Sequence, residues 1–477
     1  MTLSWFLVYS AIGWLIRVSM VPTVLRRQLA PGATWAWLGV VFLHPYIGGF
    51  LYILIGETRL SPRRAELHRS IVAQFRSPGT NVGSSDSIAG LDATYKPMVL
   101  QAEKISGMPI RGGNAVEFFR ESSQLVDRLV ADIDAAKTRV HLLYYIFCSD
   151  GTGKRVIDAL VRAAARGVEC RVLADAVASR WFFRPGGTAS QLTDHDVQVA
   201  AALPVASLRQ GLPRMDLRNH RKLSVIDGAM AYVGSHNLIN PDYGGNRAGP
   251  WVDMTARLTG PVVAELESVF CEDWAFESGE MLERLYPQGP PPIADGVPMQ
   301  VVPTGPSPSD ETYRRVLLAA IQSARSQLIL TTPYFVPDEP ALVSLMMAAD
   351  RGVDVKLLLP QHPDHLFTAA AGRAHFARLM EAGVNIHLFK PGLLHTKSAT
   401  VDNAFALFGS ANLDVRSFNL NFELSVLIYD RAVTGQMRDI QLNYLKDSVP
   451  LSPQEWSRRS VIKVYTDGAV SLLSPLL

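Results

Sequence analysis

HRKLSVID (His220–Asp227), followed by GSHN (Gly234–Asn237), decides the fold, because HTKSATVD (His395–Asp402), followed by GSAN (Gly409–Asn412), repeats it later in the chain. Both copies have the pattern H-x-K-x-x-x-x-D, and the glycine of G-S-x-N follows the histidine by 14 residues in each. One such match is weak evidence of function. Two copies with the same spacing indicate a duplicated unit.

The sequence around the two motifs is duplicated as well. IDAAKTRVHLLYYIF from Ile133 resembles IQSARSQLILTTPYF from Ile321, and RGVECRVLAD from Arg166 resembles RGVDVKLLLP from Arg351. Each pair has the pattern of an amphipathic helix or its end, followed by an apolar strand. The alternation predicts an α/β fold with a buried, largely parallel sheet. We therefore expect two tandem α/β/α domains related by a pseudo-twofold axis.

Changes in composition give the expected domain boundaries. YPQGPPPIADGVP at 286–298 is rich in proline, which continues neither a helix nor a central strand, so it predicts an interdomain linker. RSPGTNVGSSDS at 76–87 is rich in glycine and serine and lies within an expected connector at 61–105. The first domain is then expected at 106–285, the second at 299–450 and a C-terminal tail at 451–477.

Residues 1–60 are expected to form a transmembrane helical hairpin. Residues 34–55 carry no formal charge unless His44 is protonated, and they match the roughly 20 residues that a helix needs to cross a bilayer. Pro45 is expected to kink this helix. Residues 3–25 form an earlier apolar stretch, which either spans or is re-entrant or interfacial, because Arg17 interrupts it at a cost in free energy.

The arginines near these stretches predict an orientation. Two spans would place the main body on the same side as the start of the chain, with Arg26 and Arg27 in the loop on the other side. Arg59, Arg63, Arg64 and Arg69 follow the second stretch. The larger positive cluster favours a multi-pass protein with a cytoplasmic body.

Bulk composition excludes few functions. The 477 residues carry a net charge of only +2, so charge gives no reason to expect a nucleic-acid partner. The three cysteines, Cys148, Cys170 and Cys271, are widely spaced and form neither a disulfide framework nor a zinc motif. No metal site and no cofactor are expected.

The duplicated polar residues suit attack on a phosphodiester. Such a reaction needs a nucleophile and a proton donor on opposite sides of phosphorus, and His220 and His395 can divide these roles because imidazole titrates near neutral pH. The alternating spacing is expected to put each histidine on the same side of a strand as Lys222 or Lys397. Each lysine then offers positive charge to the phosphate oxygens. Further hydrogen-bond donors to phosphate are expected from Asn237, Asn412, Ser235 and Ser410.

Four carboxylates are candidates for supporting roles. Glu423 and Asp253 can each accept the Nδ1 proton of a catalytic histidine, which fixes its tautomer and raises its basicity. Asp227 and Asp402 belong to the motifs but follow the histidines at a distance. We expect them to bond nearby backbone and not phosphate.

These residues resemble the duplicated motif of the phospholipase D superfamily, over roughly residues 110–445. Within it, the chain is most similar to the bacterial cardiolipin synthases. The similarity extends to the apolar segment that ends in GETRL, to RNHRK at 218–222, to LHTK at 394–397, to GSANLDVRSFNLNFE at 409–423 and to the terminal SLLSPLL. Met254 and Thr255 depart from the family, in which many members carry a further polar residue after Trp-x-Asp.

The resemblance implies transfer of a phosphatidyl group between two phosphatidylglycerols through a phosphohistidine, giving cardiolipin and glycerol. It implies His220 as nucleophile, His395 as acid and base, and a bacterial inner membrane as location. A phospholipase D that uses water would carry the same catalytic residues, and phosphatidylserine synthase of this superfamily is a further alternative. Acyl-chain preference and homo-oligomerisation are left open.

Overall fold

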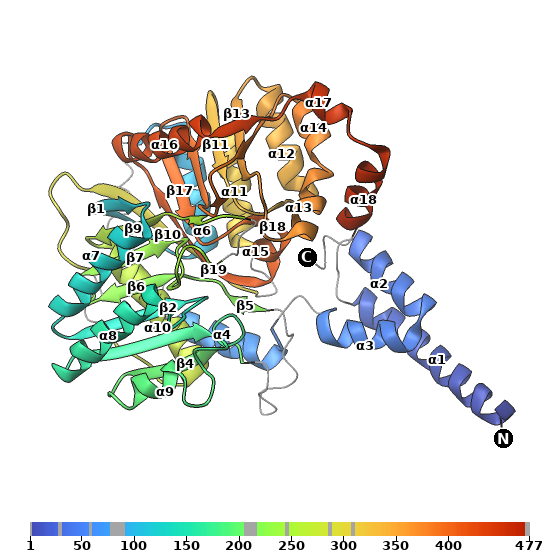
Figure 1. Ribbon diagram of the computed structural model, residues 1–477, viewed down its shortest axis with the longest axis horizontal. Coiled ribbons are helices and arrows are strands. Elements are labelled where there is room, and N and C mark those ends of the chain that lie inside the picture. The colour runs from blue at the N-terminus through green and yellow to red at the C-terminus, as the bar shows by residue number, and fades with distance from the viewer. Residues whose placement is uncertain are drawn as a thin grey trace.

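The computed structural model describes residues 2–26, 31–56, 60–76, 91–204, 217–243, 248–284, 289–306 and 311–472. Within these ranges a single 16-stranded sheet runs through the body of the molecule (Figure 1). The first half of the chain contributes β1 (Ile110–Phe119), β2 (Arg139–Tyr144), β3 (Glu169–Asp175), β4 (Gln198–Ala202), β6 (Leu223–Ile226), β7 (Met230–Gly234) and β9 (Thr255–Thr259). The second half contributes β10 (Val297–Thr304), β11 (Gln327–Thr331), β13 (Asp354–Pro360), β14 (Asn385–Phe389), β16 (Ser398–Val401), β17 (Phe405–Gly409), β19 (Asn421–Ile428) and β20 (Ser448–Pro450).

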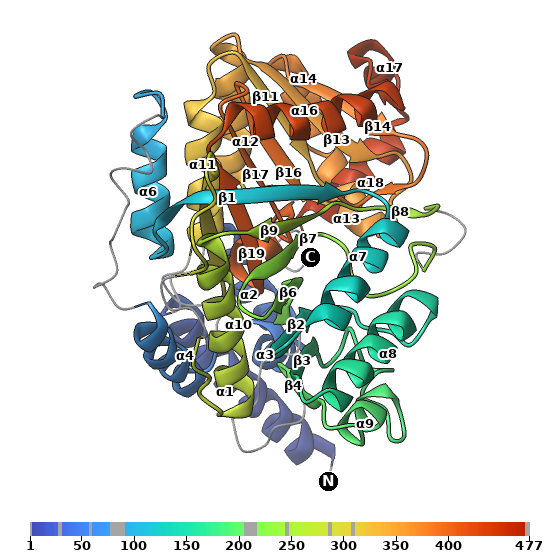
Figure 2. The same ribbon diagram turned by 90° about the vertical axis from the view of Figure 1, so that its left-hand side faces the viewer.

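The order of the strands reflects the duplication. β1 and β10 are neighbours at the centre of the sheet, and the order away from them is β1-β9-β7-β6-β2-β3-β4 on one side and β10-β19-β17-β16-β11-β13-β14 on the other. Figure 2 shows β1 crossing the middle of the molecule, with β2, β3 and β4 of the first half below it and β11, β13 and β14 of the second half above it. The repeated order confirms the prediction of two similar α/β units.

The expectation of a largely parallel sheet is wrong. β2, β3 and β4 are parallel to one another, as are β11, β13 and β14. The remaining neighbours within each half are antiparallel, as in the pairs β6/β7 and β16/β17. The connections give the physical reason. Helices connect β2 to β3 and β11 to β13, as parallel neighbours require, whereas tight turns connect β6 to β7 and β16 to β17 and make them antiparallel.

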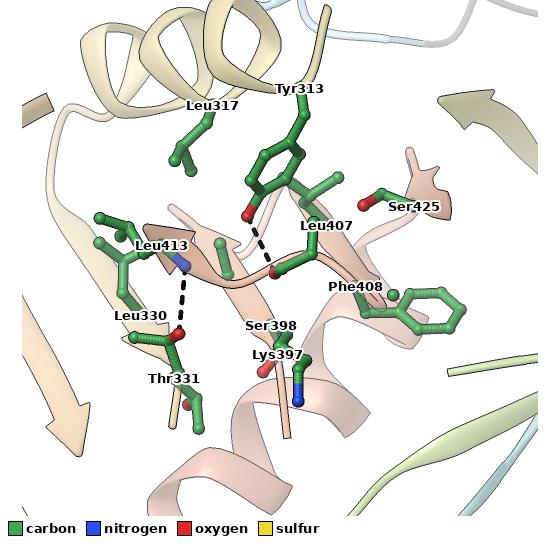
Figure 3. A pocket seen from close by; sticks show the side chains of 14 residues that line it. Tyr313, Leu317, Leu330, Thr331, Lys397, Ser398, Leu407, Phe408, Leu413 and Ser425 are labelled. Atoms are coloured by element: carbon green, nitrogen blue, oxygen red, sulfur yellow. Dashed lines mark hydrogen bonds between the residues drawn. The ribbon is translucent and has the colours of Figure 1, made fainter. Parts of the chain in front are cut away.

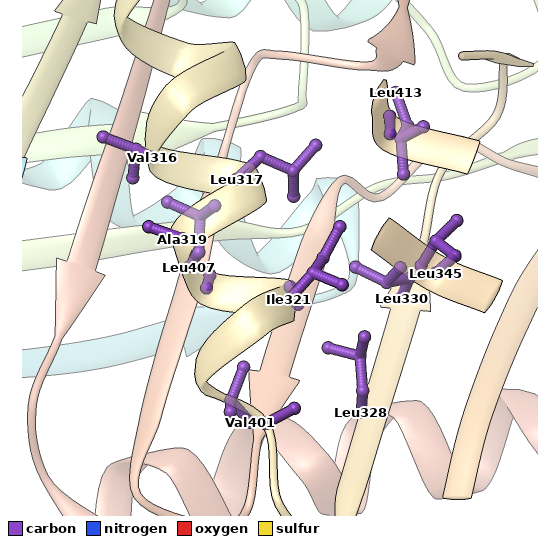
Figure 4. Packing of buried hydrophobic residues seen from close by; sticks show 14 of the residues in the cluster. Val316, Leu317, Ala319, Ile321, Leu328, Leu330, Leu345, Val401, Leu407 and Leu413 are labelled. Atoms are coloured by element: carbon purple, nitrogen blue, oxygen red, sulfur yellow. The ribbon is translucent and has the colours of Figure 1, made fainter. Parts of the chain in front are cut away.

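Helices cover both faces of the sheet. The first half has α7 (Ser122–Ala135), α8 (Gly151–Ala165), α9 (Thr188–Thr193) and α10 (Val262–Ser278). The second half has α11 (Thr312–Ser323), α12 (Glu339–Asp350), α13 (Leu366–Arg373), α14 (Phe376–Glu381), α15 (Val415–Asn419) and α16 (Arg431–Lys446). Figure 4 shows Leu317 and Ile321 of α11 facing Leu330 of β11, Val401 of β16 and Leu407 of β17, all of them buried. This apolar layer holds the strands that carry the second motif.

The segment predicted as a connector contains two helices. α4 (Pro62–Phe75) contacts α10, and α6 (Lys96–Ser106) contacts α11, so the segment touches both halves. Nearly all of the predicted Gly/Ser-rich stretch lies outside the described residues. At the predicted proline-rich linker, β10 already begins at Val297.

The N-terminal region differs from the predicted pair of spans. It consists of α1 (Thr2–Leu25), α2 (Pro31–Leu43) and α3 (Pro45–Ile55), which project from the body (Figure 1). Of the described helices, only the Trp5–Leu25 stretch of α1 is long and apolar enough to cross a membrane. The predicted span at 34–55 is not one helix, because Pro45 lacks a backbone N–H and His44 has the non-helical φ of -142° and ψ of 87°. A hairpin of two spans is therefore not shown.

The predicted C-terminal tail carries two helices. They are α17 (Pro453–Ser457) and α18 (Val461–Ser471). Arg373 of α13 and Arg459 both pair with Asp467 of α18, which is buried. The last five residues of the predicted apolar terminus lie outside the described residues.

Candidate active site

Two short parallel strand pairs bring the two motifs together. β5 (Arg218–Asn219), which precedes His220, pairs with Asn421 and Phe422 at the start of β19. β15 (Leu393–Leu394), which precedes His395, pairs with β8 (Trp251–Val252) of the first half. The backbone N–H of His220 donates to the carbonyl of Phe422 at 2.9 Å, and that of His395 to the carbonyl of Val252 at 2.8 Å. Each histidine therefore lies beside the residue that follows its hydrogen-bond acceptor in the other half, which is Glu423 for His220 and Asp253 for His395.

Glu423 and Asp253 are the two acids that the sequence predicts to hold the histidines. Nδ1 of His220 lies 2.9 Å from Oε2 of Glu423, and Nδ1 of His395 lies 2.5 Å from Oδ1 of Asp253. The sequence predicts that each acid holds a histidine. The structure adds that each acid holds the histidine of the other half, which no spacing along the chain reveals.

The predicted role of Ser235 and Ser410 in phosphate binding is not supported. Their hydroxyls donate to Asp253 and Glu423, each at 2.6 Å, and accept from the backbone N–H groups of Met254 and Leu424. A hydroxyl has one proton, so these two protons are committed to the carboxylates. The serines thus fix the acids that bond the histidines.

Glu423 has the larger set of hydrogen-bond donors. In addition to Ser410 and His220, the hydroxyl of Ser417 donates to it at 2.9 Å and the amide of Asn421 at 3.1 Å. Among the described groups, Asp253 receives only the bonds from Ser235 and His395. The carboxylate with more hydrogen-bond donors therefore faces His220.

The glycine of each G-S-x-N segment is required by close packing. A Cβ on Gly234 would lie 2.3 Å from the carbonyl oxygen of Met254, and a Cβ on Gly409 would lie 2.2 Å from that of Leu424. Only glycine allows this approach. The contact holds each G-S-x-N segment against the strand region that carries the supporting acid.

Asn237 and Asn412 line the pocket that contains both histidines. Oδ1 of Asn237 accepts a hydrogen bond from the backbone N–H of Ile146 at 3.2 Å. Oδ1 of Asn412 is buried and has no partner among the described protein groups. A buried amide oxygen in that state is costly unless a ligand or water bonds to it, so the site suits a polar ligand.

The lysines do not lie on strands beside the histidines, although the sequence predicts that they do. Residues 220–222 and 395–397 precede β6 and β16 and are not themselves strands. Nζ of Lys222 donates to the carbonyl of His220 at 2.7 Å, and Nζ of Lys397 to that of His395 at 2.6 Å. Each buried amino group thus folds back over the backbone of its own histidine.

A small cavity lies behind the second motif. Figure 3 shows Lys397 at its edge, with Tyr313 and Leu317 on the opposite side. The hydroxyl of Tyr313 donates to the carbonyl of Ala411 at 3.3 Å, and the N–H of Leu413 donates to Oγ1 of Thr332 at 3.2 Å. These bonds fix the backbone on both sides of Asn412.

Asp227 and Asp402 occupy turns away from the pocket. Both have positive φ, 51° and 52°, in the hairpins that join β6 to β7 and β16 to β17. Asp227 accepts from the backbone N–H groups of residues 137, 138 and 139, and Asp402 from those of residues 325, 326 and 327. This geometry agrees with the expected bonding to backbone, and neither carboxylate lines the pocket of the histidines.

Aromatic side chains surround the histidines, and the sequence alone did not single them out. The ring of Tyr145 lies 4.7 Å from that of His220, and the ring of Trp251 lies 4.1 Å from that of His395. Further lining residues not predicted for the site are Arg218, Tyr243, Tyr334, Asp364, His365, Thr368, Asp414 and Arg416. Three of them lie in segments that resemble the family, Arg218 in 218–222 and Asp414 and Arg416 in 409–423, and this resemblance is the signal that could have identified them.

Burial sets the charge state of the site. It lowers the pKa of His220 to about 4 and that of His395 to about 3, although the facing carboxylates oppose the shift. Burial also lowers the pKa of Lys397 to about 8 and that of Lys222 well below its usual range. In the ligand-free pocket both histidines are neutral at pH 7, and Lys397 is still mostly charged.

The two supporting carboxylates are ionised. Burial alone would raise the pKa of Glu423, but the interaction with His220, the nearby amino group of Lys222 and the hydrogen bond from Ser410 outweigh it, and the pKa is lowered. The same balance, with His395 as partner, lowers the pKa of Asp253. An ionised acceptor at Nδ1 leaves the Nε2 lone pair of a neutral imidazole available to attack an electrophile.

Comparisons with known proteins identify the family of the chain. The family described as "Cardiolipin synthase, PLD-like domain" matches residues 129–274 and 317–443. The chain belongs to this family. Cardiolipin synthase A of Edwardsiella ictaluri (strain 93-146) is 35% identical over 490 residues, which cover 100% of this chain and 99% of that protein. Cardiolipin synthase A of Yersinia pseudotuberculosis serotype O:1b is 34% identical over 492 residues, with the same coverage.

A solved structure extends the comparison to the fold. The chain is similar to phosphatidylserine synthase of Haemophilus influenzae Rd KW20, with a TM-score of 0.58 and 14% identity, over 81% of this chain and 100% of that one. At this identity the likeness concerns the fold alone. The two ranges of this chain that match the cardiolipin synthase family, 129–274 and 317–443, correspond to the two halves of the sheet.

Proposed function

We propose that the protein is a cardiolipin synthase that transfers a phosphatidyl group from one phosphatidylglycerol to another. The observation that carries the proposal is the pair of crossed His–carboxylate contacts at a single pocket between the two halves. Two neutral imidazoles with ionised partners face a space lined by the two motif asparagines. A two-step transfer at phosphorus needs two such imidazoles, one as the nucleophile and one that exchanges a proton with the leaving and entering oxygens.

In the first step Nε2 of His220 attacks phosphorus of the donor lipid. The bond from phosphorus to the glycerol oxygen breaks, and this oxygen takes a proton from Nε2 of His395. The pKa of His395 is low in the ligand-free pocket because of burial. The arriving phosphodiester carries a negative charge, which favours the protonated imidazole and makes His395 a competent acid.

In the second step His395 takes a proton from the headgroup hydroxyl of another phosphatidylglycerol. The hydroxyl oxygen attacks phosphorus, the bond from phosphorus to His220 breaks, and cardiolipin leaves. Lys222 and Lys397 supply positive charge close to the histidines, while Asn237 and Asn412 offer amide donors to the phosphate oxygens. The assignment of His220 as nucleophile is supported by its greater exposure, 8% against 2% for His395.

A lipid substrate is also supported by apolar side chains at the edge of the pocket. Leu366 and Phe367 are 60% and 68% exposed, and their neighbours His365 and Thr368 line the pocket. A phosphodiester entering here would bring its acyl chains against an apolar surface. The apolar α1 supports a location in the bacterial inner membrane, and the arginines that follow support a cytoplasmic body.

The test is a product assay with the purified protein in phosphatidylglycerol vesicles, read by mass spectrometry. We expect cardiolipin and one glycerol per cardiolipin. Phosphatidic acid with glycerol would show that water is the acceptor and the enzyme a phospholipase D. Formation of phosphatidylserine from an activated donor and serine would favour the other alternative.

The roles of the histidines need a separate experiment. A radiolabelled donor, acid-free quenching and peptide mapping should place the phosphoryl label on His220. His395→Ala should acquire the label slowly, because the first step lacks its acid, and should then retain it, because the second step lacks its base. A label on His395 in the unsubstituted protein would reverse the roles.

A further inference from the structure

We propose that, within the described residues, α1 alone crosses the bilayer and that α2 and α3 form a re-entrant hairpin beside it. The Thr2 end of α1 and the catalytic body then lie on opposite sides of the membrane. The proposal concerns topology and does not depend on the proposed reaction.

The helix lengths allow one crossing. α1 has 24 residues and is about 36 Å long at 1.5 Å per residue, which exceeds the hydrocarbon thickness of about 30 Å. α2 has 13 residues and α3 has 11, which gives only about 20 Å and about 16 Å. Neither α2 nor α3 spans a bilayer by itself, and the chain turns between them at His44.

The turn at His44 is closed by tight packing. A Cβ on Gly48 would lie 2.6 Å from Cα of Val41, so the two helices touch through backbone close to the turn. Farther from it, the rings of Trp37 on α2 and Tyr52 on α3 meet edge to face at 5.2 Å. α3 therefore runs back along α2 and does not continue in the same direction.

Contacts with α1 show which end of the hairpin is deep. Near the turn, the ring of Tyr46 stacks on that of Tyr9 at 4.5 Å, its hydroxyl donates to the carbonyl of Tyr9, and a Cβ on Gly13 would lie 3.4 Å from Cγ of Pro45. Farther along α1, Met20 and Val24 form one buried cluster with Trp37 and Tyr52, which lie away from the turn, and with Val41. The open end of the hairpin consists of the start of α2 and the end of α3. It thus lies beside the Leu25 end of α1.

Arg17 acts on the break between the helices. Its Nε donates to the carbonyl of Phe42 at 3.1 Å, in the last turn of α2. A helix that ends leaves carbonyls without intrahelical partners, and such groups are expensive in a bilayer. A donor from α1 at this depth offsets part of that cost. Arg17 in the otherwise apolar α1 is therefore explained by its bond to the end of α2. This explanation requires that α2 and α3 are inserted in the bilayer.

The outer surface of the three helices suits lipid. Leu43 at the turn is 85% exposed, and Phe50 and Ile53 on α3 are 62% and 66% exposed. Residues 31–55 contain no Asp, Glu, Lys or Arg. Apolar side chains of this size exposed around a turn would be unfavourable in water and are favourable in hydrocarbon.

The distribution of charge is also simpler with one crossing. Residues 1–16 contain no Lys or Arg, whereas Arg26 and Arg27 follow α1, and Arg59, Arg63, Arg64 and Arg69 follow α3. With a re-entrant hairpin all six arginines lie on the body side. With two spans, Arg26 and Arg27 would face the other side and oppose the positive-inside rule.

The test is cysteine accessibility in the full-length protein, expressed in spheroplasts of a Gram-negative host. Cys148→Ala removes the half-buried thiol, and Cys170 and Cys271 are buried. On this background Arg26→Cys reports the loop after α1, Glu381→Cys reports the body, and a cysteine added before Met1 reports the start of α1. Each is exposed to a membrane-impermeant maleimide before and after the membrane is opened.

We expect Arg26→Cys and Glu381→Cys to be labelled from the same side and the added cysteine from the opposite side. Labelling of Arg26→Cys and Glu381→Cys from opposite sides, or of the added cysteine and Glu381→Cys from the same side, would overturn the proposal. Cardiolipin formation in the same membranes is measured separately. An inactive protein with the expected labelling would contradict the proposed function and leave the topology standing.

Discussion

At the scale of single residues, the site is organised by acids that act on the histidine of the other half. Glu423 accepts hydrogen bonds from His220, Ser410, Ser417 and Asn421, and all of these groups are buried. A carboxylate with four donors is held in one orientation. It therefore fixes the tautomer of His220 as well as stabilising the imidazolium.

Glu423→Gln should retain the fold and lose activity. The amide presents a donor to Nδ1 and favours the wrong tautomer, so we expect kcat to fall by about 10²–10⁴, as for comparable His–carboxylate pairs. Initial rates at saturating phosphatidylglycerol and the melting temperature provide the measurement. Glu280→Gln is the matched control, since Glu280 is a half-exposed acid that pairs with Arg171 outside the pocket. A kcat within twofold of the unsubstituted protein would contradict an orienting role.

Asp402→Asn should behave in the opposite way. Its carboxylate accepts three backbone N–H groups at residues 325–327, so the amide leaves donors poorly paired and should cost about 1–3 kcal/mol of unfolding free energy. We expect a lower melting temperature and a kcat per folded molecule that is nearly unchanged. Asn412→Ala, in the pocket, should lower kcat with little change in melting temperature. If Asp402→Asn lost activity without losing stability, its motif aspartate would have a direct role in the reaction.

At the scale of elements, short strands and one buried side chain align the motifs. Arg221 donates to the carbonyl of Glu423 at 3.1 Å, to Asp273 of α10 at 2.5 Å and to the carbonyl of Thr304 at the end of β10 at 2.9 Å. It thereby ties the first motif to α10, β19 and β10 at once. The corresponding position in the second motif is Thr396, which makes its bond to the carbonyl of Val252. The two half-sites are thus fixed by different means.

The start of α13 gives a prediction about lipid access. Phe367→Ser removes an exposed apolar ring beside the pocket and should lower the rate on phosphatidylglycerol in vesicles several-fold. The rate on a short-chain monomeric analogue should change little, because the phosphodiester contacts are intact. Met347→Ser on α12, which is 53% exposed and does not line the pocket, is the control for loss of surface apolarity. Equal losses on both substrates would show that Phe367 supports the fold of the pocket and not the approach of acyl chains.

At the scale of the whole molecule, two halves share one sheet and one site, so stability and activity are coupled. The catalytic histidines lie at the interface of the halves, and both have a pKa below their unfolded value of about 6.5. Unfolding therefore takes up protons at these groups when the pH lies between their folded-state pKa values of about 3 to 4 and about 6.5.

The stability of the protein should fall as the pH is lowered from about 6.5 to about 4. In this window the unfolded imidazoles are protonated and the folded ones are neutral, so the unfolded state binds more protons; above it the two states bind equally at these sites. Melting temperatures in detergent at several pH values give the measurement. The double variant His220→Gln, His395→Gln should show a shallower decline, because neither side chain titrates. An equally steep decline in the variant would assign the acid sensitivity to other buried groups, such as His68 or His141.

The sequence by itself determined the family, the duplication and the chemical inventory of the site. Two copies of H-x-K-x-x-x-x-D with a shared offset to G-S-x-N are local features, and local spacing is readable along the chain. Glu423 and Asp253 were also found, because an imidazole nucleophile needs an acceptor at Nδ1. The roles of all these residues in catalysis stay predictions until the variants above are measured.

Only the tertiary structure decided how these parts combine. The exchange of acids between halves depends on the pairing of β5 with β19 and of β8 with β15, which joins residues about 140–200 positions apart. The serines turned out to hold the carboxylates, and the second apolar stretch folded back at His44 with Arg17 bonded to its end. In each case the sequence supplies the polar group, but long-range packing sets its partner. Periodicity and spacing along the chain carry no information about which residues pack together.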